Sequence, residues 1–336
     1  MNVSQALRWY RRVGTAAAGF EYVDHRGTPV RDESALARFA ALAIPPAWTD
    51  VHIAPDEGRK VQAWGRDAAG RKQYIYAASY IARRERRKWG RVLRFGLVLP
   101  RLREVTNRHL KTPPYRRERV LATVVRLMCR AFFRVGSERY AVRNRTFGIC
   151  TLAKSHLELD GSTLRFRYTG KRRKDQRQVV ADTPLVEVVA ELLELPGPRL
   201  FQYVDAAGRI RPVTAEATNQ YLCEVLGSRY TSKDIRTFGG TVRAATILSD
   251  LGPASTERET KRNLAIATRL VALELGNTPS IARKAYIHPA VLEEYRRAGR
   301  TIATHPRGLS RPVEAIAPST LYPEEAALIR FLERYG

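Results

Sequence analysis

The sequence predicts an α+β chain of two domains, and three observations support this fold class. Short strand-like segments separated by turns occupy residues 51–76. Helical periodicity dominates from residue 101 onward, and strand-like segments interrupt it only between residues 156 and 180. We therefore expect a small β-rich N-terminal domain, residues 1–90, and a larger, mainly helical domain, residues 91–336, with a three-stranded β insert.

The N-terminal domain is expected to have its own core, because all four tryptophans fall within the first 90 residues: Trp9, Trp48, Trp64 and Trp89. Residues 51–53 and 60–64 are strand-like, residues 67–70 indicate a turn, and residues 71–76 form the next strand. Residues 81–91 are dense in positive charge and are expected to form a helix or linker that leaves this domain.

One face of the strand at residues 71–76 is chemically distinctive. Side chains alternate along a strand, so Lys72, Tyr74 and Tyr76 share a face. A cation beside two phenols suits phosphate contact combined with stacking or groove contact. The alternative is an ordinary sheet face with tyrosine rings over a core edge.

The larger domain begins with helices. Residues 119–133 have apolar side chains at helical spacing, and Pro113 and Pro114 end the helix before them. Strands at 156–159 and 164–168 flank a turn at 160–162, a second tip follows at 170–175, and residues 178–180 form the third strand. The chain after residue 183 is expected to be almost wholly helical, with helices at 184–195, 214–226, 232–250, 256–276, 278–286, 289–298 and 323–335.

The charge points to a polyanionic partner. Lysine and arginine number 59 against 33 acidic residues, a formal net charge of +26. Nucleic acid is the leading candidate, and an anionic membrane surface is the weaker one. No apolar stretch of about 18 residues could span a bilayer, and the first residues do not resemble a secretory signal. The three cysteines are odd in number and lack metal-ligand spacing, so we expect reduced, buried thiols in the cytoplasm.

Four residues in separate clusters form a chemical set: Arg134, Lys171, Arg236 and Tyr286. Each alone has an ordinary explanation, as a helix-end cation, an exposed turn residue, an ion-pair partner or a packing tyrosine. Together, two arginines can bind nonbridging phosphate oxygens, a lysine can protonate a leaving oxygen, and a tyrosine can attack phosphorus. This chemistry requires no metal, because the guanidiniums supply the positive charge. No Walker loop is present, so nothing in the sequence indicates nucleotide use.

In this order and with these local motifs, the chain resembles the type IB DNA topoisomerases of the small poxviral and bacterial kind. The most specific segments are KDIRT at 233–237 and NTPSIARKAY at 277–286. AIPPAWTDV at 43–51 and GRDAAGRKQY at 65–74 also resemble that family. The resemblance covers residues from about 20 to about 300.

The resemblance implies a C-shaped clamp around duplex DNA, acting as a monomer in the cytoplasm near the nucleoid, without metal or cofactor. Tyr286 would attack a backbone phosphate to give a 3′-phosphotyrosyl link, while Arg134 and Arg236 bind its oxygens. Lys171 would protonate the leaving 5′ oxygen, and Lys233 would assist or hold the DNA. The cut strand would rotate and rejoin, which relaxes supercoils without ATP.

The chain departs from the poxviral and nuclear relatives at Asn277, where they carry a histidine. An amide can still donate to a phosphate oxygen, but it adds no charge. His288 is a weaker substitute, because residues i and i+2 of a helix do not share a face.

The expected DNA-binding residues outside the catalytic set are Lys72, Gln73, Tyr74, Tyr76, Arg83 and Arg84. Two other functions remain open. A tyrosine recombinase shares the arginine–lysine–tyrosine chemistry, but it usually has a helical N-terminal module and histidine at the position of Lys233. A non-catalytic basic DNA-binding protein would also carry the charge, but it would not need the Tyr286 motif.

Overall fold

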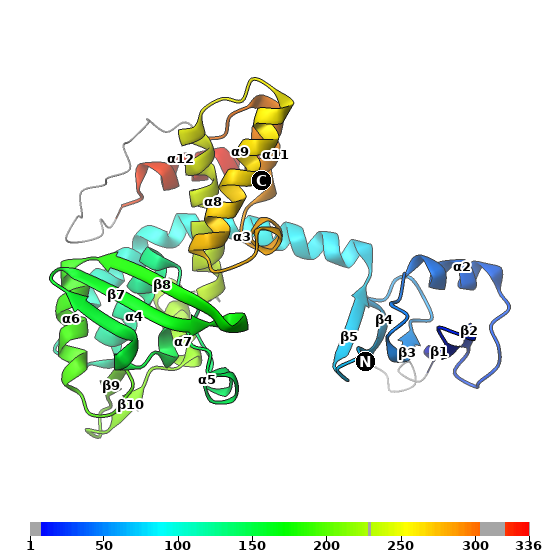
Figure 1. The fold of residues 1–336 in the computed structure, drawn as a ribbon, viewed down its shortest axis with the longest axis horizontal. Helices are drawn as coiled ribbons and strands as arrows, with labels where there is room; N and C mark the ends of the chain where they lie inside the picture. The colour runs from blue at the N-terminus through cyan, green and yellow to red at the C-terminus, as the bar shows by residue number, and fades with distance from the viewer. Residues whose placement is uncertain (1–7, 228–229, 303–319, 336) are drawn as a thin grey trace. The chain divides into compact units, whose positions relative to one another are not determined.

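The computed structural model describes residues 8–227, 230–302 and 320–335, and the chain divides into two compact units, Met1–Lys88 and Trp89–Gly336. The predicted fold class is confirmed: a small β-rich unit precedes a larger helical unit that contains a three-stranded sheet (Figure 1). Residues 303–319, which precede the predicted helix at 323–335, lie outside the described residues. None of the described helices is long and apolar enough to cross a membrane.

The first unit contains one antiparallel sheet of five strands in the order β2-β1-β3-β4-β5. Its strands are β1 (Tyr10–Thr15), β2 (Gly19–Val23), β3 (Thr49–Ile53), β4 (Val61–Arg66) and β5 (Lys72–Tyr76), with helix α2 at Glu33–Ala41. The helix packs Phe39 against Val51, Ile53 and Ala63 of the sheet. β1, β2 and α2 were not predicted from the sequence. For β1 the reason is that the strand is rich in arginine and mostly exposed, so it gives a weak alternation signal.

A single helix, α3 (Ala78–His109), begins in the first unit and continues into the second. The sequence indicated a helix or linker at 81–91 and helical structure again from residue 101. The helix continues through Pro100, because buried positions at helical spacing lie on both sides of it: Val92, Phe95, Leu99, Leu102 and Thr106. Burial of this apolar stripe compensates for the backbone donor that proline lacks.

The first unit has its own core, as predicted, but the four tryptophans do not all belong to it. Trp48 packs against the core of the first unit, but Trp89 packs against the core of the second. Trp64 lies on the sheet face, stacked on His52 with ring centroids 4.0 Å apart. Phe39 rather than a tryptophan is the largest fully buried side chain of the small core.

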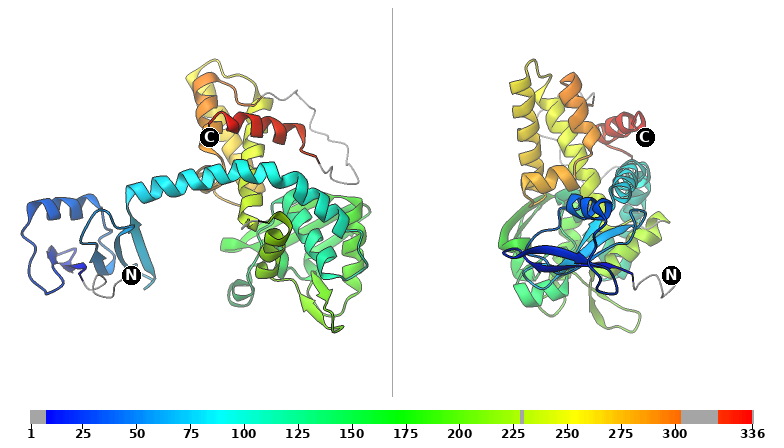
Figure 2. Two further views of the ribbon diagram at one scale, coloured as in Figure 1. Left: turned by 180° about the vertical axis from the view of Figure 1, so that it is seen from behind. Right: turned by 90° about the vertical axis from the view of Figure 1, so that its right-hand side faces the viewer.

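The second unit places helices around a three-stranded antiparallel sheet. The sheet consists of β6 (Leu157–Asp160), β7 (Thr163–Gly170) and β8 (Lys174–Ala181), and α4 (Arg117–Ala131) and α6 (Thr183–Glu194) pack against it (Figure 2). Both predicted turns of this insert are present. The remaining helices are α5 (Glu138–Asn144), α7 (Ala215–Leu226), α8 (Ser232–Leu251), α9 (Glu257–Glu274), α10 (Pro279–Ala285), α11 (Pro289–Ala298) and α12 (Pro323–Glu333).

The segment after residue 183 is less helical than expected, because β9 (Gln202–Val204) and β10 (Ile210–Pro212) form a hairpin. Its loop repeats the Asp-Ala-Ala-Gly turn that the sequence analysis recognised between β4 and β5. Asp205 accepts from the backbone N–H groups of Ala207 and Arg209. Asp67 accepts in the same way from the N–H groups of Ala69 and Arg71. The turn signal was therefore present, but the flanking strands are too short to show alternation.

All three cysteines are free. Cys150 is buried, whereas Cys129 and Cys223 are partly buried. Burial raises the pKa of the Cys129 and Cys150 thiols to about 11, so both are protonated near neutral pH.

Candidate active site

Arg134 follows α4, where the chain leaves the helix through a left-handed residue. Phe132 has φ +52°, and its N–H donates to the carbonyl of Met128 at 3.0 Å. The Arg134 side chain reaches the loop between α9 and α10. Its Nη2 donates to the carbonyl of Gly276 at 2.8 Å and to Oδ1 of Asn277 at 2.6 Å.

Arg236 reaches the same loop from the buried side of α8, and its side chain is almost fully enclosed. Its Nη2 donates to the carbonyl of Leu275 at 2.7 Å, and its Nη1 donates to the carbonyl of Phe132. Arg134 Nη2 also contacts the Leu275 carbonyl, at 3.3 Å. Burial and the charge of Arg134 lower the pKa of Arg236 to about 10, so the guanidinium keeps its charge near neutral pH. The fold thus fixes two cations side by side before any ligand binds.

Two consecutive glycines of α8 permit this close packing. A β-carbon on Gly239 would lie 2.1 Å from Cε1 of Phe132, and a β-carbon on Gly240 would lie 3.0 Å from the carbonyl oxygen of Tyr286. Both glycines lie within the helix, so space rather than backbone conformation selects them. The FGG segment therefore lets α8 approach both the end of α4 and the tyrosine.

Tyr286 lies immediately after α10, and its ring faces Arg236, whose Cζ is 5.3 Å from the ring centroid. The Thr241 hydroxyl shares its proton between the carbonyls of Thr237, at 2.8 Å, and Tyr286, at 3.2 Å. It also accepts from the backbone N–H of His288 at 3.1 Å, which holds the chain after Tyr286 against α8. Burial raises the pKa of the phenol. The charges of Arg236 and Arg134, a hydrogen bond from Arg236 and a smaller effect of Lys233 outweigh burial and lower the pKa below that of an ordinary tyrosine. This environment favours the phenolate, which is the nucleophilic form.

In the described part of the chain, the amide of Asn277 is hydrogen-bonded through its oxygen but not through its nitrogen. Its Oδ1 accepts from Arg134, but its buried Nδ2 has no hydrogen-bond partner among the residues that the structure describes. A buried donor without a partner costs about 1–3 kcal/mol. The group is therefore available to donate to an oxygen of a ligand bound beside the arginines.

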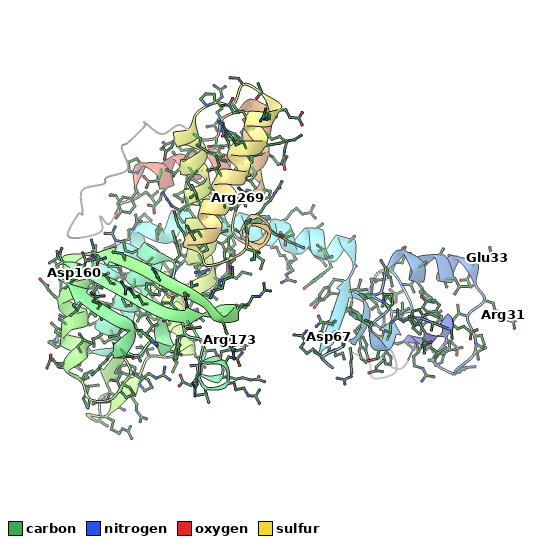
Figure 3. All side chains as sticks on the ribbon, viewed as in Figure 1. Arg31, Glu33, Asp67, Asp160, Arg173 and Arg269 are labelled. Carbon is green, nitrogen blue, oxygen red and sulfur yellow. The ribbon has the colours of Figure 1, made fainter. Side chains whose placement is uncertain are left out.

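The two lysines of the predicted set lie differently. Lys233 is exposed in the first turn of α8, one turn before Arg236, and contributes to the lowered pKa of Tyr286. Lys171 is exposed at the tip of the β7–β8 hairpin, where Figure 3 labels Arg173 at the projecting end. Arg172 and Arg173 have left-handed φ values of +64° and +56°. The structure thus brings five of the six predicted catalytic residues together and leaves Lys171 on the adjacent hairpin.

His288 has a structural role. It is the N-cap of α11, and its Nδ1 accepts from the backbone N–H of Ala290 at 3.2 Å. Its ring packs edge-on against Trp89, with centroids 5.1 Å apart. The ring therefore caps α11 and packs against Trp89.

One face of the sheet in the first unit carries neighbouring aromatic and basic side chains. Tyr74 is 46% exposed and stacks on Tyr76 at 6.0 Å, and Lys72 Nζ lies 3.5 Å from the Trp64 ring centroid. Gln73 alternates to the other face, where its amide donates to Asp67 at 2.8 Å. Arg83 and Arg84 are exposed at the start of α3.

Helix α5 is a candidate surface that the sequence analysis missed. Tyr140 is 59% exposed and Val142 is 74% exposed, and Arg139 and Arg143 flank them. The helix follows Arg134 by only a few residues. The sequence holds only the alternation of arginines with Tyr140 and Val142, and the exposure that makes this a surface is visible only in the fold.

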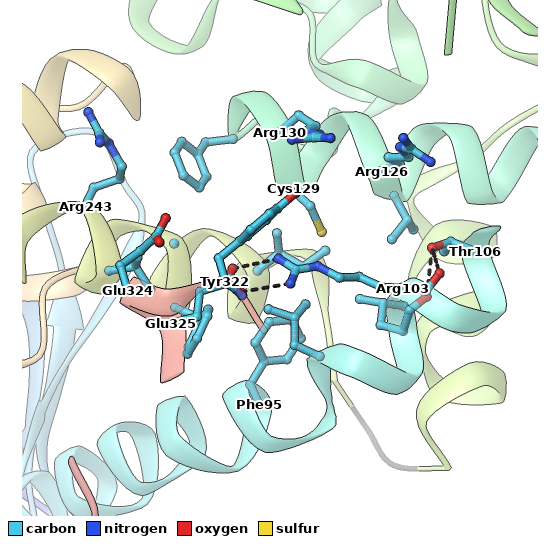
Figure 4. A pocket seen from close by; sticks show the side chains of 18 of the residues that line it. Phe95, Arg103, Thr106, Arg126, Cys129, Arg130, Arg243, Tyr322, Glu324 and Glu325 are labelled. Carbon is cyan, nitrogen blue, oxygen red and sulfur yellow. Dashed lines mark hydrogen bonds and ion pairs between the residues drawn. The ribbon is translucent and has the colours of Figure 1, made fainter. Parts of the chain in front are cut away.

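A cavity of about 180 Å³ lies between α3, α4, α8 and α12, and Phe132 forms part of its lining (Figure 4). Arg103 crosses it and pairs with Glu325 at 2.7 Å and 2.9 Å. Neither Arg134 nor Tyr286 lines it, so this cavity is separate from the arginine–tyrosine cluster. In the described part of the chain, no group of three histidine, cysteine, aspartate or glutamate side chains could hold a metal ion.

Comparison with known proteins places this geometry in a family. Residues 77–309 match the model of the eukaryotic DNA topoisomerase I catalytic core, and residues 19–67 match the bacterial DNA topoisomerase IB N-terminal domain. A DNA topoisomerase 1B of Acanthamoeba polyphaga mimivirus is 32% identical over 268 residues, which cover 78% of this chain and 80% of the viral protein. The DNA topoisomerase 1B of vaccinia virus (strain Copenhagen) is 24% identical over 275 residues, covering 79% and 83% of the two chains.

Proposed function

Because the chain belongs to the type IB DNA topoisomerase family, we propose that it relaxes supercoiled DNA by transient cleavage of one strand through Tyr286. The observation that carries the proposal is the convergence of Arg134, Arg236 and the open amide of Asn277 beside that tyrosine. These donors suit a phosphate whose negative charge grows in the transition state.

In the cleavage step, Oη of Tyr286 forms a bond to the scissile phosphorus, and the bond from phosphorus to the 5′ oxygen breaks. The phenolic proton passes to solvent, helped by the lowered pKa. Arg134 and Arg236 donate to the nonbridging oxygens, and Asn277 Nδ2 adds an uncharged donor. The product is a 3′-phosphotyrosyl ester and a free 5′-hydroxyl.

The departing 5′ oxygen needs a proton, and Lys171 is the proposed donor. It lies exposed on the tip of the β7–β8 hairpin, beside the arginine–tyrosine cluster, and we propose that bound DNA contacts this tip. Lys233, whose charge contributes to the lowered pKa of Tyr286, is proposed to assist by charge. In religation the 5′-hydroxyl attacks phosphorus, Lys171 takes back the proton, and Tyr286 leaves. One phosphate ester replaces another, so the cycle needs no ATP.

The basic surface supplies DNA affinity. Exposed Lys72 and Tyr74 and the partly buried Tyr76 form a basic and aromatic face of the first unit. We propose that this face, together with Arg83 and Arg84, contacts phosphates and groove edges. Gln73 lies on the other face of β5, where its amide donates to Asp67, and is not part of this surface. A single copy closing around the duplex, in the cytoplasm near the nucleoid, completes the proposal.

A plasmid assay without ATP and with EDTA tests this function. Wild-type protein is expected to relax supercoiled plasmid and to form a covalent protein–DNA adduct after denaturation. Tyr286→Phe removes one oxygen and is expected to abolish both while retaining DNA binding in gel retardation. Relaxation by the Phe variant would show that Tyr286 is not the nucleophile. Recombination between defined sites without general relaxation would instead favour a tyrosine recombinase, and binding without an adduct would favour a basic DNA-binding protein.

A further inference from the structure

One side chain of β8 lies between the hairpin that carries Lys171 and the loop that carries Asn277. That side chain is Gln176, which pairs in register with Tyr168 and so faces the interior side of the sheet. Its Nε2 donates to the carbonyl of Asp175 at 3.0 Å, which folds the side chain back toward the hairpin tip.

Gln176 fills the space over two glycines. A β-carbon on Gly170 would lie 2.6 Å from Cγ of Gln176, and a β-carbon on Gly276 would lie 2.4 Å from its Oε1. Gly170 immediately precedes Lys171, and Gly276 immediately precedes Asn277. The two glycines allow the glutamine to contact both backbones closely.

The loop at Gly276 determines where the catalytic arginines lie. Gly276 has φ +61°, a left-handed conformation that favours glycine. The carbonyl of Gly276 accepts from Arg134 at 2.8 Å. The preceding carbonyl, of Leu275, accepts from both arginines. Any contact that sets the distance between the hairpin and this loop also sets the distance between the proton donor and the phosphate-binding groups.

We propose that Gln176 is a positioning residue that holds the Lys171 hairpin at the correct distance from the Leu275–Gly276–Asn277 loop. The proposal rests on the proposed function, because it assigns Lys171 as the proton donor to the 5′ oxygen. Gln176 acts by filling space between the two backbones rather than by touching DNA. Its removal lets the tip shift, which harms proton transfer more than phosphate binding.

The test compares two leaving groups in single-turnover cleavage of a duplex whose cleavage site has first been mapped with wild-type protein. One substrate has the normal 5′ oxygen and the other has sulfur in that bridging position. A thiolate leaves without a proton, so the sulfur substrate bypasses the proton donor. Gln176→Ala is expected to slow the oxygen substrate by about ten- to a hundredfold, the scale of a small misplacement of a catalytic group, and the sulfur substrate by less than about threefold.

Three further variants complete the design. Lys171→Ala is expected to show the same asymmetry with a larger loss, and Val179→Ala, on the opposite face of β8, is expected to leave both rates unchanged. Gln176→Met fills the same space and is expected to restore the oxygen rate to within about threefold of wild type, because packing rather than hydrogen bonding carries the spacing.

The outcomes separate the inference from the function it rests on. Equal loss on both substrates in Gln176→Ala, or no loss on either, overturns the positioning role. A Gln176→Met variant as slow as Gln176→Ala overturns it as well. Absence of any wild-type adduct on both substrates refutes the proposed function instead, and a Lys171→Ala defect that sulfur does not relieve refutes the assigned proton donor.

Discussion

Replacing Gly240 by alanine is expected to lower the rate of DNA cleavage while leaving the protein folded. The new β-carbon would lie 3.0 Å from the Tyr286 carbonyl oxygen, 3.1 Å from Cδ1 of Leu275 and 3.4 Å from Cβ of Tyr286. Comfortable contacts between heavy atoms begin near 3.5 Å, so the tyrosine must move by roughly half an ångström. A misplacement of about 1 Å can cost a hundredfold in rate, so we expect a loss on the order of tenfold in single-turnover cleavage.

The stability effects of the same change partly cancel. Alanine in a helix interior is more favourable than glycine by about 1 kcal/mol, while overpacking costs about 1–3 kcal/mol. The net loss is therefore about 0–2 kcal/mol, and the melting temperature is expected to fall by at most about 8 °C. Gly90→Ala in α3 is the matched control, because its β-carbon would meet only the flexible end of Arg94 at 3.4 Å. Wild-type cleavage by Gly240→Ala, with its fold intact, would refute the claim that α8 sets the position of Tyr286.

Three further predictions concern the tyrosine, the core and the DNA surface. Ultraviolet titration of wild-type protein against Tyr286→Phe should reveal a phenol that ionises below the ordinary pKa of 10, because Arg236 and its neighbouring cations favour the phenolate; a difference spectrum that develops only above pH 10 would contradict this. Asp182→Asn should destabilise the second unit by about 3–5 kcal/mol in urea, because the fully buried Asp182 accepts two hydrogen bonds of 2.9 Å from Arg126, and an unchanged midpoint would disprove it. Lys72→Ala should reduce the slope of log affinity against log salt by about one while leaving single-turnover cleavage at saturating protein unchanged; an unchanged slope would remove Lys72 from the phosphate contacts.

Helix positions could be predicted well because the apolar spacing of the second unit is long and regular. The predicted helix at 289–298 agrees with α11 at both ends, where Pro289 and Gly299 mark the boundaries. The three-residue strands β9 and β10 are too short to show periodicity, and β1 could not be predicted because it is rich in arginine and mostly exposed.

The candidate site was predictable as a set of residues but not as an arrangement. The motifs singled out Arg134, Arg236 and Tyr286, yet nothing in their spacing showed that both arginines are held by the Leu275 carbonyl. Contacts between backbone carbonyls and distant side chains leave no local pattern in a sequence. The same holds for Gln176, whose contacts with two glycines exist only in the folded chain.

The open amide of Asn277 has an evolutionary consequence. Within the described structure its buried N–H has no partner, so the free protein is less stable than it could be. Selection for stability alone would replace this side chain, whereas selection for the phosphate contact that we propose would retain it. In a lineage that no longer required strand cleavage, this position would be among the first to drift, toward residues that satisfy the loop without reaching for DNA.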